Sequence, residues 1–275
     1  MSAVPPSRRK GDAGILASIV DLAATPRLRM FAGPNGSGKS TIKSVVADMI
    51  GPELFGVYIN ADDIELEISR TGHLDLSVYG VETSAEEILN FFRSSAFLAE
   101  KGLSDATARL EFVGGKLFFE TVEVNSYFAS VAVDFLRQKL LEAGVTFTFE
   151  TVMSHHSKVD FLKQAQEKGF RTYLYYVATE DPDINISRVE SRVAQGGHYV
   201  SRDKIVDRYY RSLDLLADAV QFANRAYIFD NSSAEKVWVA EVTDNSILSL
   251  KTDTMPFWFE TFLWDKFGPL DETGG

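Results

Sequence analysis

The nine residues from Gly33 to Thr41 constrain the fold more than any other feature of the chain. They read Gly-Pro-Asn-Gly-Ser-Gly-Lys-Ser-Thr and match the pattern G-x-x-x-x-G-K-[ST]. The apolar residues 28–32 precede them, and the helix-like residues 41–50 follow. A strand that runs through a glycine-rich turn into a helix is the setting in which this pattern binds nucleotide phosphates.

Each residue type in this loop has a chemical purpose. Glycines permit positive φ angles and bring backbone N–H groups against phosphate oxygens. Lys39 supplies a charge for the β and γ phosphates, and Ser40 supplies a hydroxyl for Mg²⁺. We predict binding of ATP, or alternatively GTP, together with Mg²⁺. The predicted nucleotide-binding residues are Gly33, Pro34, Asn35, Gly36, Ser37, Gly38, Lys39, Ser40 and Thr41.

Composition narrows the class of protein. The 275 residues, 45% of them hydrophobic, suffice for one large domain with appendages. Because cysteine is absent, disulfides, thiolate metal sites and a cysteine nucleophile are excluded. The formal charge of −11 disfavours a nucleic acid as the main ligand and leaves a small anion compatible. No apolar run approaches the ~20 residues of a membrane span, so we expect a soluble, cytoplasmic protein.

Strand-like and helix-like segments alternate along the chain. This alternation predicts an α/β fold of the P-loop NTPase class, with three α/β/α layers around a mostly parallel sheet. The expected strands are 28–32, 57–59, 145–149, 172–177, 226–229, 236–240 and 247–250. The expected helices are 14–23, 41–50, 64–69, 82–101, 131–142, 157–168, 183–194, 201–223 and 256–266.

This pattern also suggests how the domain is organised. We expect a disordered segment at 1–13, a P-loop kinase domain at 14–250, and a docked helix with a tail at 251–275. A small hairpin insertion is expected at about 110–127, with Gly114-Gly115 at its turn. The paired glycines of the segment 195–199 suggest a mobile lid spanning about 186–208.

Acidic residues follow three of the expected strands: Asp62, Glu150 and Asp230. Ligands of parallel sheets bind at the carboxyl ends of the strands. Asp62 could accept the proton of a substrate hydroxyl, although Asp62 or Asp63 could instead cap the next helix. Glu150 could bind substrate hydroxyls or a water on Mg²⁺. Because Phe-Glu-Thr-Val occurs at both 119–122 and 149–152, Glu120 is the alternative to Glu150.

Basic residues lie on the expected lid. Arg188 and Arg192 are four residues apart and therefore share one face of a helix, where solvated side chains are the usual finding. A lid arginine could instead stabilise the charge on the phosphoryl group being transferred. His155 and His156 could bind a metal, but no third ligand is evident.

The motifs, taken in order, resemble those of the zeta-toxin-type P-loop kinases, in the branch labelled predicted ABC-type ATPases. The matching residues are Phe31 to Thr41, Asn60 to Asp62, Phe149 to Ser154, Arg188-Val189, Arg192-Val193, Gly196 to His198, Arg208-Tyr209, Arg211 to Leu213 and Asp230 to Ser232. The resemblance implies an ATP- and Mg²⁺-dependent kinase that phosphorylates a small-molecule hydroxyl, as on UDP-N-acetylglucosamine, and is restrained by a small antitoxin protein.

The same resemblance assigns roles to single residues. It implies that Lys39 and Ser40 hold phosphate and Mg²⁺, Asp62 is the base, and Arg188 is a catalytic lid arginine. The substrate-binding residues that it implies are Asp62, Glu150, Thr151, Arg192 and His198. The chain departs from the toxins in the lid: they have a second lid arginine, and the corresponding loop of this chain carries Gly-Gly-His at 196–198. Two other functions stay open: a nucleotide-hydrolysing switch, and a kinase acting on nucleic-acid ends.

Overall fold

The computed structural model describes residues 25–119, 122, 125–197 and 199–267. The segment 1–13 and the helix expected at 14–23 lie outside these residues. In the described part of the chain, no helix combines the length and apolar character needed to cross a bilayer.

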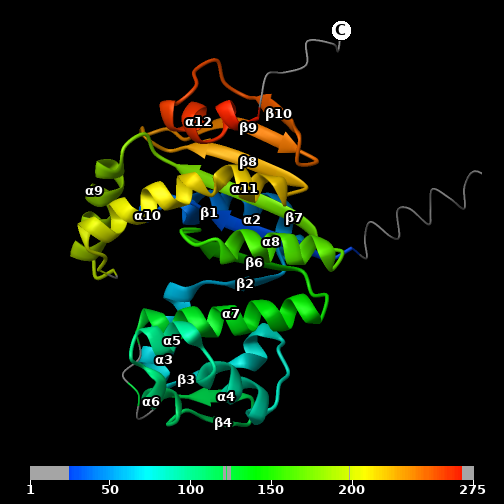
Figure 1. Ribbon diagram of the computed structural model, residues 1–275, viewed down its shortest axis with the longest axis vertical. Helices are drawn as coiled ribbons and strands as arrows, with labels where there is room; N and C mark the ends of the chain where they lie inside the picture. Colours follow the sequence, from blue (N-terminus) through cyan, green and yellow to red (C-terminus); the bar gives the residue numbers. More distant parts are fainter. Residues whose placement is uncertain (1–24, 120–121, 123–124, 198, 268–275) are drawn as a thin grey trace, which may run out of the picture.

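A seven-stranded sheet forms the centre of the molecule, in the order β10-β9-β8-β7-β1-β6-β2 (Figure 1). The five strands from β2 to β8 in this order are parallel, and β9 and β10 add an antiparallel edge. The predicted mostly parallel sheet is confirmed. Its strands are β1 (Arg27–Ala32), β2 (Val57–Ile59), β6 (Phe147–Thr151), β7 (Arg171–Ala178), β8 (Arg225–Asp230), β9 (Val237–Thr243) and β10 (Ile247–Leu250).

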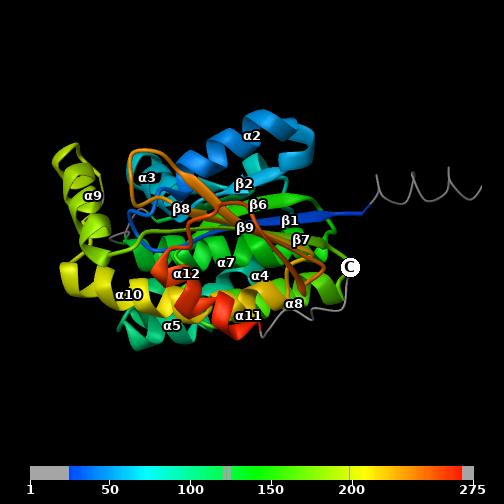
Figure 2. The same cartoon turned by 90° about the horizontal axis from the view of Figure 1, so that it is seen from above.

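Helices cover both faces of this sheet, as the three-layer prediction requires. The α-helices are α2 (Lys39–Phe55), α3 (Ala61–Thr71), α4 (Ala85–Arg93), α5 (Ala96–Glu100), α6 (Ser104–Thr107), α7 (Ser126–Glu142), α8 (Ser157–Glu167), α9 (Pro182–Ala194), α10 (Arg202–Asp214), α11 (Leu216–Gln221) and α12 (Phe257–Phe262). Figure 2 shows α2 on one face and α7, α8, α11 and α12 on the other. The strand β1 between these layers is almost wholly buried, which explains its continuous apolar run.

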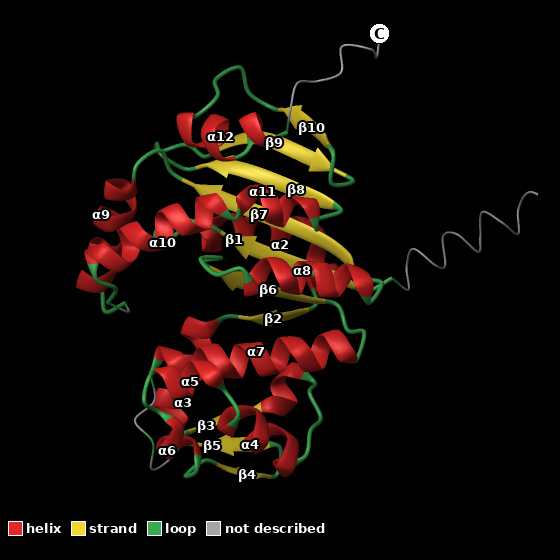
Figure 3. Cartoon of the chain, viewed as in Figure 1, coloured by secondary structure: helices red, strands yellow, loops and turns green. Residues whose placement is uncertain are grey.

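A second, three-stranded antiparallel sheet lies beyond α7 (Figure 3). The predicted hairpin is confirmed as β4 (Glu111–Val113) and β5 (Lys116–Phe118), joined through Gly114-Gly115. Both glycines have positive φ, as a two-residue hairpin turn requires. The sequence analysis missed its third strand, β3 (His73–Asp75), because three residues are too few to show alternation.

Two predictions of single long helices are wrong. The expected helix 82–101 is divided into α4 and α5 because Ser95 starts a new helix, its hydroxyl accepting from the backbone N–H of Leu98 at 3.3 Å. The expected helix 201–223 is divided into α10 and α11 at Leu215. Short 3₁₀ turns, η1 (Leu76–Tyr79) and η2 (Trp264–Lys266), were not predicted.

Helix α12 docks through buried aromatic side chains, so the expected docked helix at 256–266 is confirmed in its first half. Trp258 and Phe259 are almost fully buried. The indole Nε1 of Trp258 donates to Asp230 Oδ2 at 2.8 Å. This bond joins the C-terminal helix to the end of β8.

Two glycines that precede the neighbouring strands β2 and β6 allow a test of backbone packing. Gly56 has φ 67° and Gly144 has φ 65°. A Cβ at Gly56 would lie 2.1 Å from the carbonyl oxygen of Thr146, whereas a Cβ at Gly144 would meet nothing within 4 Å. We expect Gly144→Ala to lower the free energy of unfolding by about 1 kcal/mol, the usual effect of alanine at positive φ.

The matched variant Gly56→Ala adds a steric clash to the same backbone strain, so we expect a loss of roughly 3 kcal/mol or more. Denaturant unfolding of the two variants and the wild type measures the difference. Equal losses would show that β2 can shift away from Thr146 without effect on the fold.

Candidate active site

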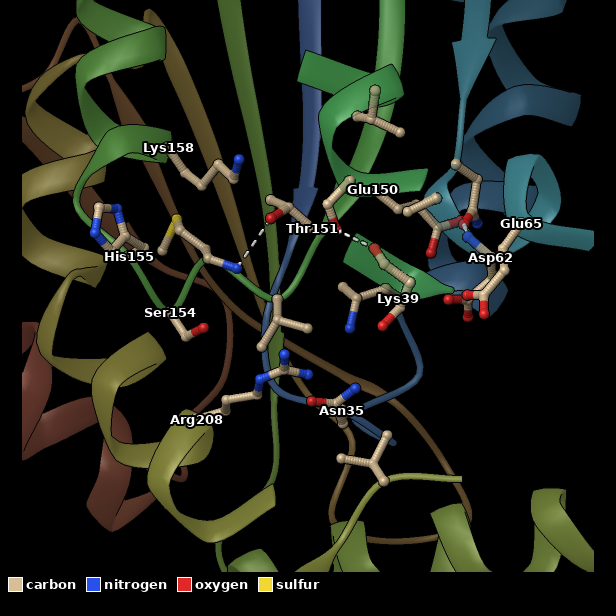
Figure 4. Close-up of a pocket in the computed structure, with 18 of the residues that line it drawn as sticks. Asn35, Lys39, Asp62, Glu65, Glu150, Thr151, Ser154, His155, Lys158 and Arg208 are labelled. Atoms are coloured by element: carbon tan, nitrogen blue, oxygen red, sulfur yellow. Dashed lines mark hydrogen bonds between the residues drawn. The ribbon is translucent and has the colours of Figure 1, made fainter. Parts of the chain in front are cut away.

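A cavity of about 660 Å³ lies at the carboxyl ends of the parallel strands. Its size suits a small-molecule ligand. Figure 4 shows Lys158, His155 and Arg208 on one side, Asp62 and Glu65 on the other, and Lys39 and Thr151 between them. The P-loop, Asp62 and Glu150, which are far apart in the sequence, all contribute to its lining.

The P-loop backbone is held by two asparagines from other parts of the chain. Asn185, on α9, donates from Nδ2 to the carbonyl of Asn35 at 2.6 Å. Asn231, after β8, donates from Nδ2 to the carbonyl of Ser37 at 2.7 Å. A Cβ at Gly38 would lie only 2.2 Å from the Nδ2 of Asn231, so this glycine is required for the asparagine to reach the loop.

Lys39 bends back onto its own loop. Its Nζ donates to the carbonyls of Gly33 and Pro34, at 2.8 and 2.9 Å. Burial lowers the pKa of Lys39 to about 8, and the negative charges of Glu150 and Asp62 oppose this shift. Since the hydrogen-bond partners of the ammonium among the described residues are neutral carbonyls, a phosphate oxygen could replace them and would restore a higher pKa.

Glu150 lies at the end of β6, beside β1 in the sheet. Its Oε2 accepts from the Ser40 hydroxyl at 2.9 Å, and its Oε1 accepts from the Tyr58 hydroxyl at 2.6 Å. Asn60 in turn donates to the Tyr58 hydroxyl at 2.9 Å. Burial and then the charge of Glu150 raise the pKa of Tyr58, so the phenol stays protonated. The hydroxyl and carboxylate oxygens of Ser40 and Glu150 are the ligand types that Mg²⁺ takes.

Asp62 lies in the first turn of α3 and lines the cavity. Its side chain is 63% exposed, and its Oδ2 is 3.8 Å from Nη1 of Arg192. The alternative that Asp62 or Asp63 caps the helix is wrong, because the cap is Asn60, whose Oδ1 accepts from the backbone N–H of Asp62 at 2.8 Å. Burial and then Glu150 raise the pKa of Asp63, which does not line the cavity.

Of the arginines singled out in the sequence, some line the cavity and one does not. Arg192 of α9 and Arg208 of α10 line the cavity, and Arg188 does not. Within the described residues, Nη1 of Arg188 is buried without a hydrogen-bond partner. Thr151 lines the cavity, and its hydroxyl accepts from the backbone N–H of Met153 at 3.1 Å. His198 and Glu120 lie outside the described residues, so their predicted roles stay predictions.

Asp230, expected at the site, has a structural place instead. It is 7% exposed and does not line the cavity. Its Oδ1 accepts from the backbone N–H of Ser232, and its Oδ2 accepts from the Ser232 hydroxyl and the Trp258 indole. Because these bonds satisfy both carboxylate oxygens, Asp230 fixes the loop that carries Asn231.

The sequence analysis missed a charged cluster in the cavity wall. It consists of Asp134 and Arg137 on α7 and Lys158 on α8, all of which line the cavity. The only signal was their position: Asp134 and Arg137 interrupt an otherwise apolar part of a helix in which Val133, Phe135 and Leu136 are buried. Polar residues at buried helix positions indicate a partner or a ligand.

The cavity is locally basic in an acidic chain. Its basic lining residues are Lys39, Arg137, Lys158, Arg192, Lys204 and Arg208, and its acidic ones are Asp62, Glu65, Asp134 and Glu150. With six cations against four carboxylates, the cavity attracts anions although the whole chain carries a charge of −11.

Both a protein family and a single relative match parts of the sequence. The family model described as Zeta toxin matches residues 120–243. An uncharacterized protein of Haemophilus influenzae is 25% identical over 179 residues, which are 65% of this chain and 89% of that protein.

Comparison with solved structures gives matches at low sequence identity. The AvrRxo1-ORF1:-ORF2 structure with ATP matches with a TM-score of 0.50 and 15% identity, over 100% of this chain and 82% of that chain. In the native form of that complex, the match covers 63% of the other chain. The PezAT toxin-antitoxin system of Streptococcus pneumoniae matches with a TM-score of 0.43 and 14% identity, over 84% of this chain and 82% of that chain.

The sequence match and the fold together confirm the resemblance on which the motifs were first grouped. The chain is similar to the Zeta toxin family model over residues 120–243, and it shares the fold of the AvrRxo1-ORF1:-ORF2 structure with ATP.

Proposed function

We propose that the protein is an ATP- and Mg²⁺-dependent kinase that transfers the γ-phosphoryl group to a hydroxyl of a small molecule. One observation carries the proposal: an exposed carboxylate, Asp62, lines the same cavity as the P-loop lysine and two arginines. A base, a phosphate cradle and cations around one space are the parts that phosphoryl transfer needs. A nucleotide sugar such as UDP-N-acetylglucosamine is the acceptor that the resemblance suggests.

In the proposed reaction, the P-loop backbone and Lys39 hold the phosphates, and Lys39 leaves the carbonyls of Gly33 and Pro34 to do so. Mg²⁺ would neutralise the charge of the β and γ phosphates. Ser40 would hold the metal, and Glu150, hydrogen-bonded to Ser40 at 2.9 Å, would orient a metal-bound water. This assigns Glu150 to the metal side of the site rather than to the acceptor.

The acceptor would approach from the Asp62 side. Its hydroxyl oxygen forms a bond to the γ-phosphorus, the bond to the β,γ-bridging oxygen breaks, and ADP leaves with that electron pair. Asp62 takes the hydroxyl proton. Arg192 and Arg208, which line the cavity, neutralise charge on the transferred group. Arg192 replaces Arg188 in this role because Arg188 does not line the cavity.

A small protein partner is part of the proposal. The family name includes the word toxin, and the matched AvrRxo1 structure is a complex of ORF1 and ORF2. A partner that restrains the enzyme would co-purify with it as a second, small chain and would lower its kinase rate.

The first test replaces the proposed base. We expect Asp62→Asn to lower phosphoryl transfer by about 10²-fold or more, because an amide cannot accept the proton. ATP affinity should change less than about threefold, since the amide is similar in shape. The assay incubates the protein with ATP and a metabolite extract and detects, by mass spectrometry, a product heavier by one phosphoryl group.

Asp63→Asn is the matched control, since Asp63 is the next residue but does not line the cavity. We expect it to keep transfer within about threefold of the wild type. Full activity of Asp62→Asn would reject Asp62 as the base. Release of free phosphate without any phosphorylated metabolite would favour a nucleotide-hydrolysing switch. Phosphorylation of RNA or DNA ends would favour a nucleic-acid kinase.

The second test concerns Glu150. If Glu150 orients a metal-bound water, Glu150→Gln should raise the Mg²⁺ concentration for half-maximal activity by about tenfold. The KM for the acceptor should stay within about threefold. A raised acceptor KM at unchanged Mg²⁺ dependence would return Glu150 to the substrate-binding role that the sequence suggested.

The third test is a pH dependence. Burial lowers the pKa of free Lys39 to about 8, and bound phosphates would raise it. ATP binding should therefore take up a proton above about pH 8, and affinity should fall as pH rises through that value. Calorimetry in buffers of different ionisation enthalpy measures the proton uptake. Lys39→Met should bind ATP weakly and without this pH dependence; an equal pH dependence in that variant would assign the titration to another group.

A further inference from the structure

The side of the cavity on which Lys158 lies in Figure 4, away from Asp62, carries charges that the proposed transfer does not use. We call Asp134, Arg137 and Lys158 the basic wall. Lys158 Nζ is 3.2 Å from Asp134 Oδ1, and the Arg137 guanidinium binds the same carboxylate oxygen. Because two cations share one carboxylate, one positive charge is left without a counter-charge within this group.

Arg137 is held in place and still has free donors. Its side chain is 5% exposed, and its Cζ lies 4.7 and 4.6 Å from the ring centres of Phe149 and Phe161. Among the residues that the structure describes, its Nε and Nη1 find no hydrogen-bond partner. Because these two atoms are buried beside the aromatic rings, Arg137 acts on the cavity through its positive charge, and Lys158 is the cation that can contact a ligand.

Lys158 gives this wall access to the cavity. Its side chain is 21% exposed and lines the cavity on the same side as His155 in Figure 4. Burial and then the nearby Arg137 charge lower its pKa to about 8. Burial would raise the pKa of Asp134, but the two cations outweigh burial and lower it, so the carboxylate stays ionised and occupied by them.

We propose that the basic wall binds a phosphate or diphosphate group of the acceptor, with Lys158 as the principal contact. For its place in the reaction this rests on the proposed function: an acceptor anchored at Lys158 would extend its hydroxyl across the cavity toward Asp62. The acceptor is then a phosphorylated hydroxyl compound rather than a neutral one. Cationic donors in a partly dry pocket recognise phosphate oxygens strongly.

The test is an anion titration that does not require turnover. The full chain is saturated with Mg²⁺ and a non-hydrolysable ATP analogue, which fills the P-loop, and inorganic phosphate or pyrophosphate is added while calorimetry records binding. We expect Lys158→Met to weaken anion affinity by about tenfold or more. Tighter binding of pyrophosphate than of phosphate would identify a diphosphate-bearing acceptor, and the reverse order a phosphate monoester.

Lys163→Met is the matched control, because Lys163 lies on the same helix, is exposed and does not line the cavity. It should bind the anion as the wild type does. Lys158→Arg should restore affinity to within about threefold, and Asp134→Asn should bind at least as tightly as the wild type. A merely structural role for the cluster would not produce these two results, which also test the proposal if Lys158→Met does not fold.

Wild-type affinity in Lys158→Met, or no anion binding by the nucleotide-loaded wild type, would overturn the proposal. Its failure is separate from failure of the kinase proposal. If the anion binds at Lys158 but no phosphorylated product forms, the anion site is supported and the kinase proposal is rejected. If a phosphorylated product forms but the anion does not bind, the kinase proposal is supported and the anion site is rejected. With an acceptor in hand, Lys158→Met should raise its KM and leave kcat within about threefold.

Discussion

The geometry of the site depends on the packing that fixes the P-loop backbone. Asn185 and Asn231 bind the carbonyls of Asn35 and Ser37, so that segments about 150 and 194 residues away hold this loop. A loop that binds anions through its N–H groups must direct its carbonyl oxygens away from the anion. The two asparagines donate hydrogen bonds to two of these carbonyls and so hold the loop in that orientation. Asp230, buried and bound to Trp258, keeps Asn231 in place, so the C-terminal helix indirectly supports phosphate binding.

The second constraint is electrostatic. An acidic chain of charge −11 collects six cations around one cavity, and three of them, Arg137, Lys158 and Arg192, pair with carboxylates of the same cavity. Two of these pairings separate the site into two ends. Asp62 faces Arg192 near the P-loop, and Asp134 faces Arg137 and Lys158 in the far wall. Such a division suits a reaction in which a nucleotide and a second anion meet at one hydroxyl, because each anion has its own cations.

The sequence predicted the parts of the fold whose signals are local. The strand-loop-helix of the P-loop, the parallel strands, the Gly114-Gly115 hairpin and the first half of the docked aromatic helix all follow from short-range patterns, and the structure contains each of them. The errors arose where a single capping residue or a distant neighbouring strand decides the secondary structure. Ser95 starts a second helix inside an apolar periodic segment, and the three residues of β3 form a strand only because β5 lies beside them.

Some residues of the site could also be predicted from local sequence patterns, and others could not. The sequence by itself determined that a phosphate loop, Asp62 and Glu150 lie at strand ends, because the carboxyl ends of parallel strands must meet at one edge of the sheet. Only the tertiary structure decided which cations join them: Arg188 and Arg192 share a helix face, but of the two only Arg192, one turn further along α9, lines the cavity. It also decided that Asp230 is structural and that Asp134, Arg137 and Lys158 form a wall, since these roles depend on contacts between elements far apart in the sequence, which no local pattern encodes.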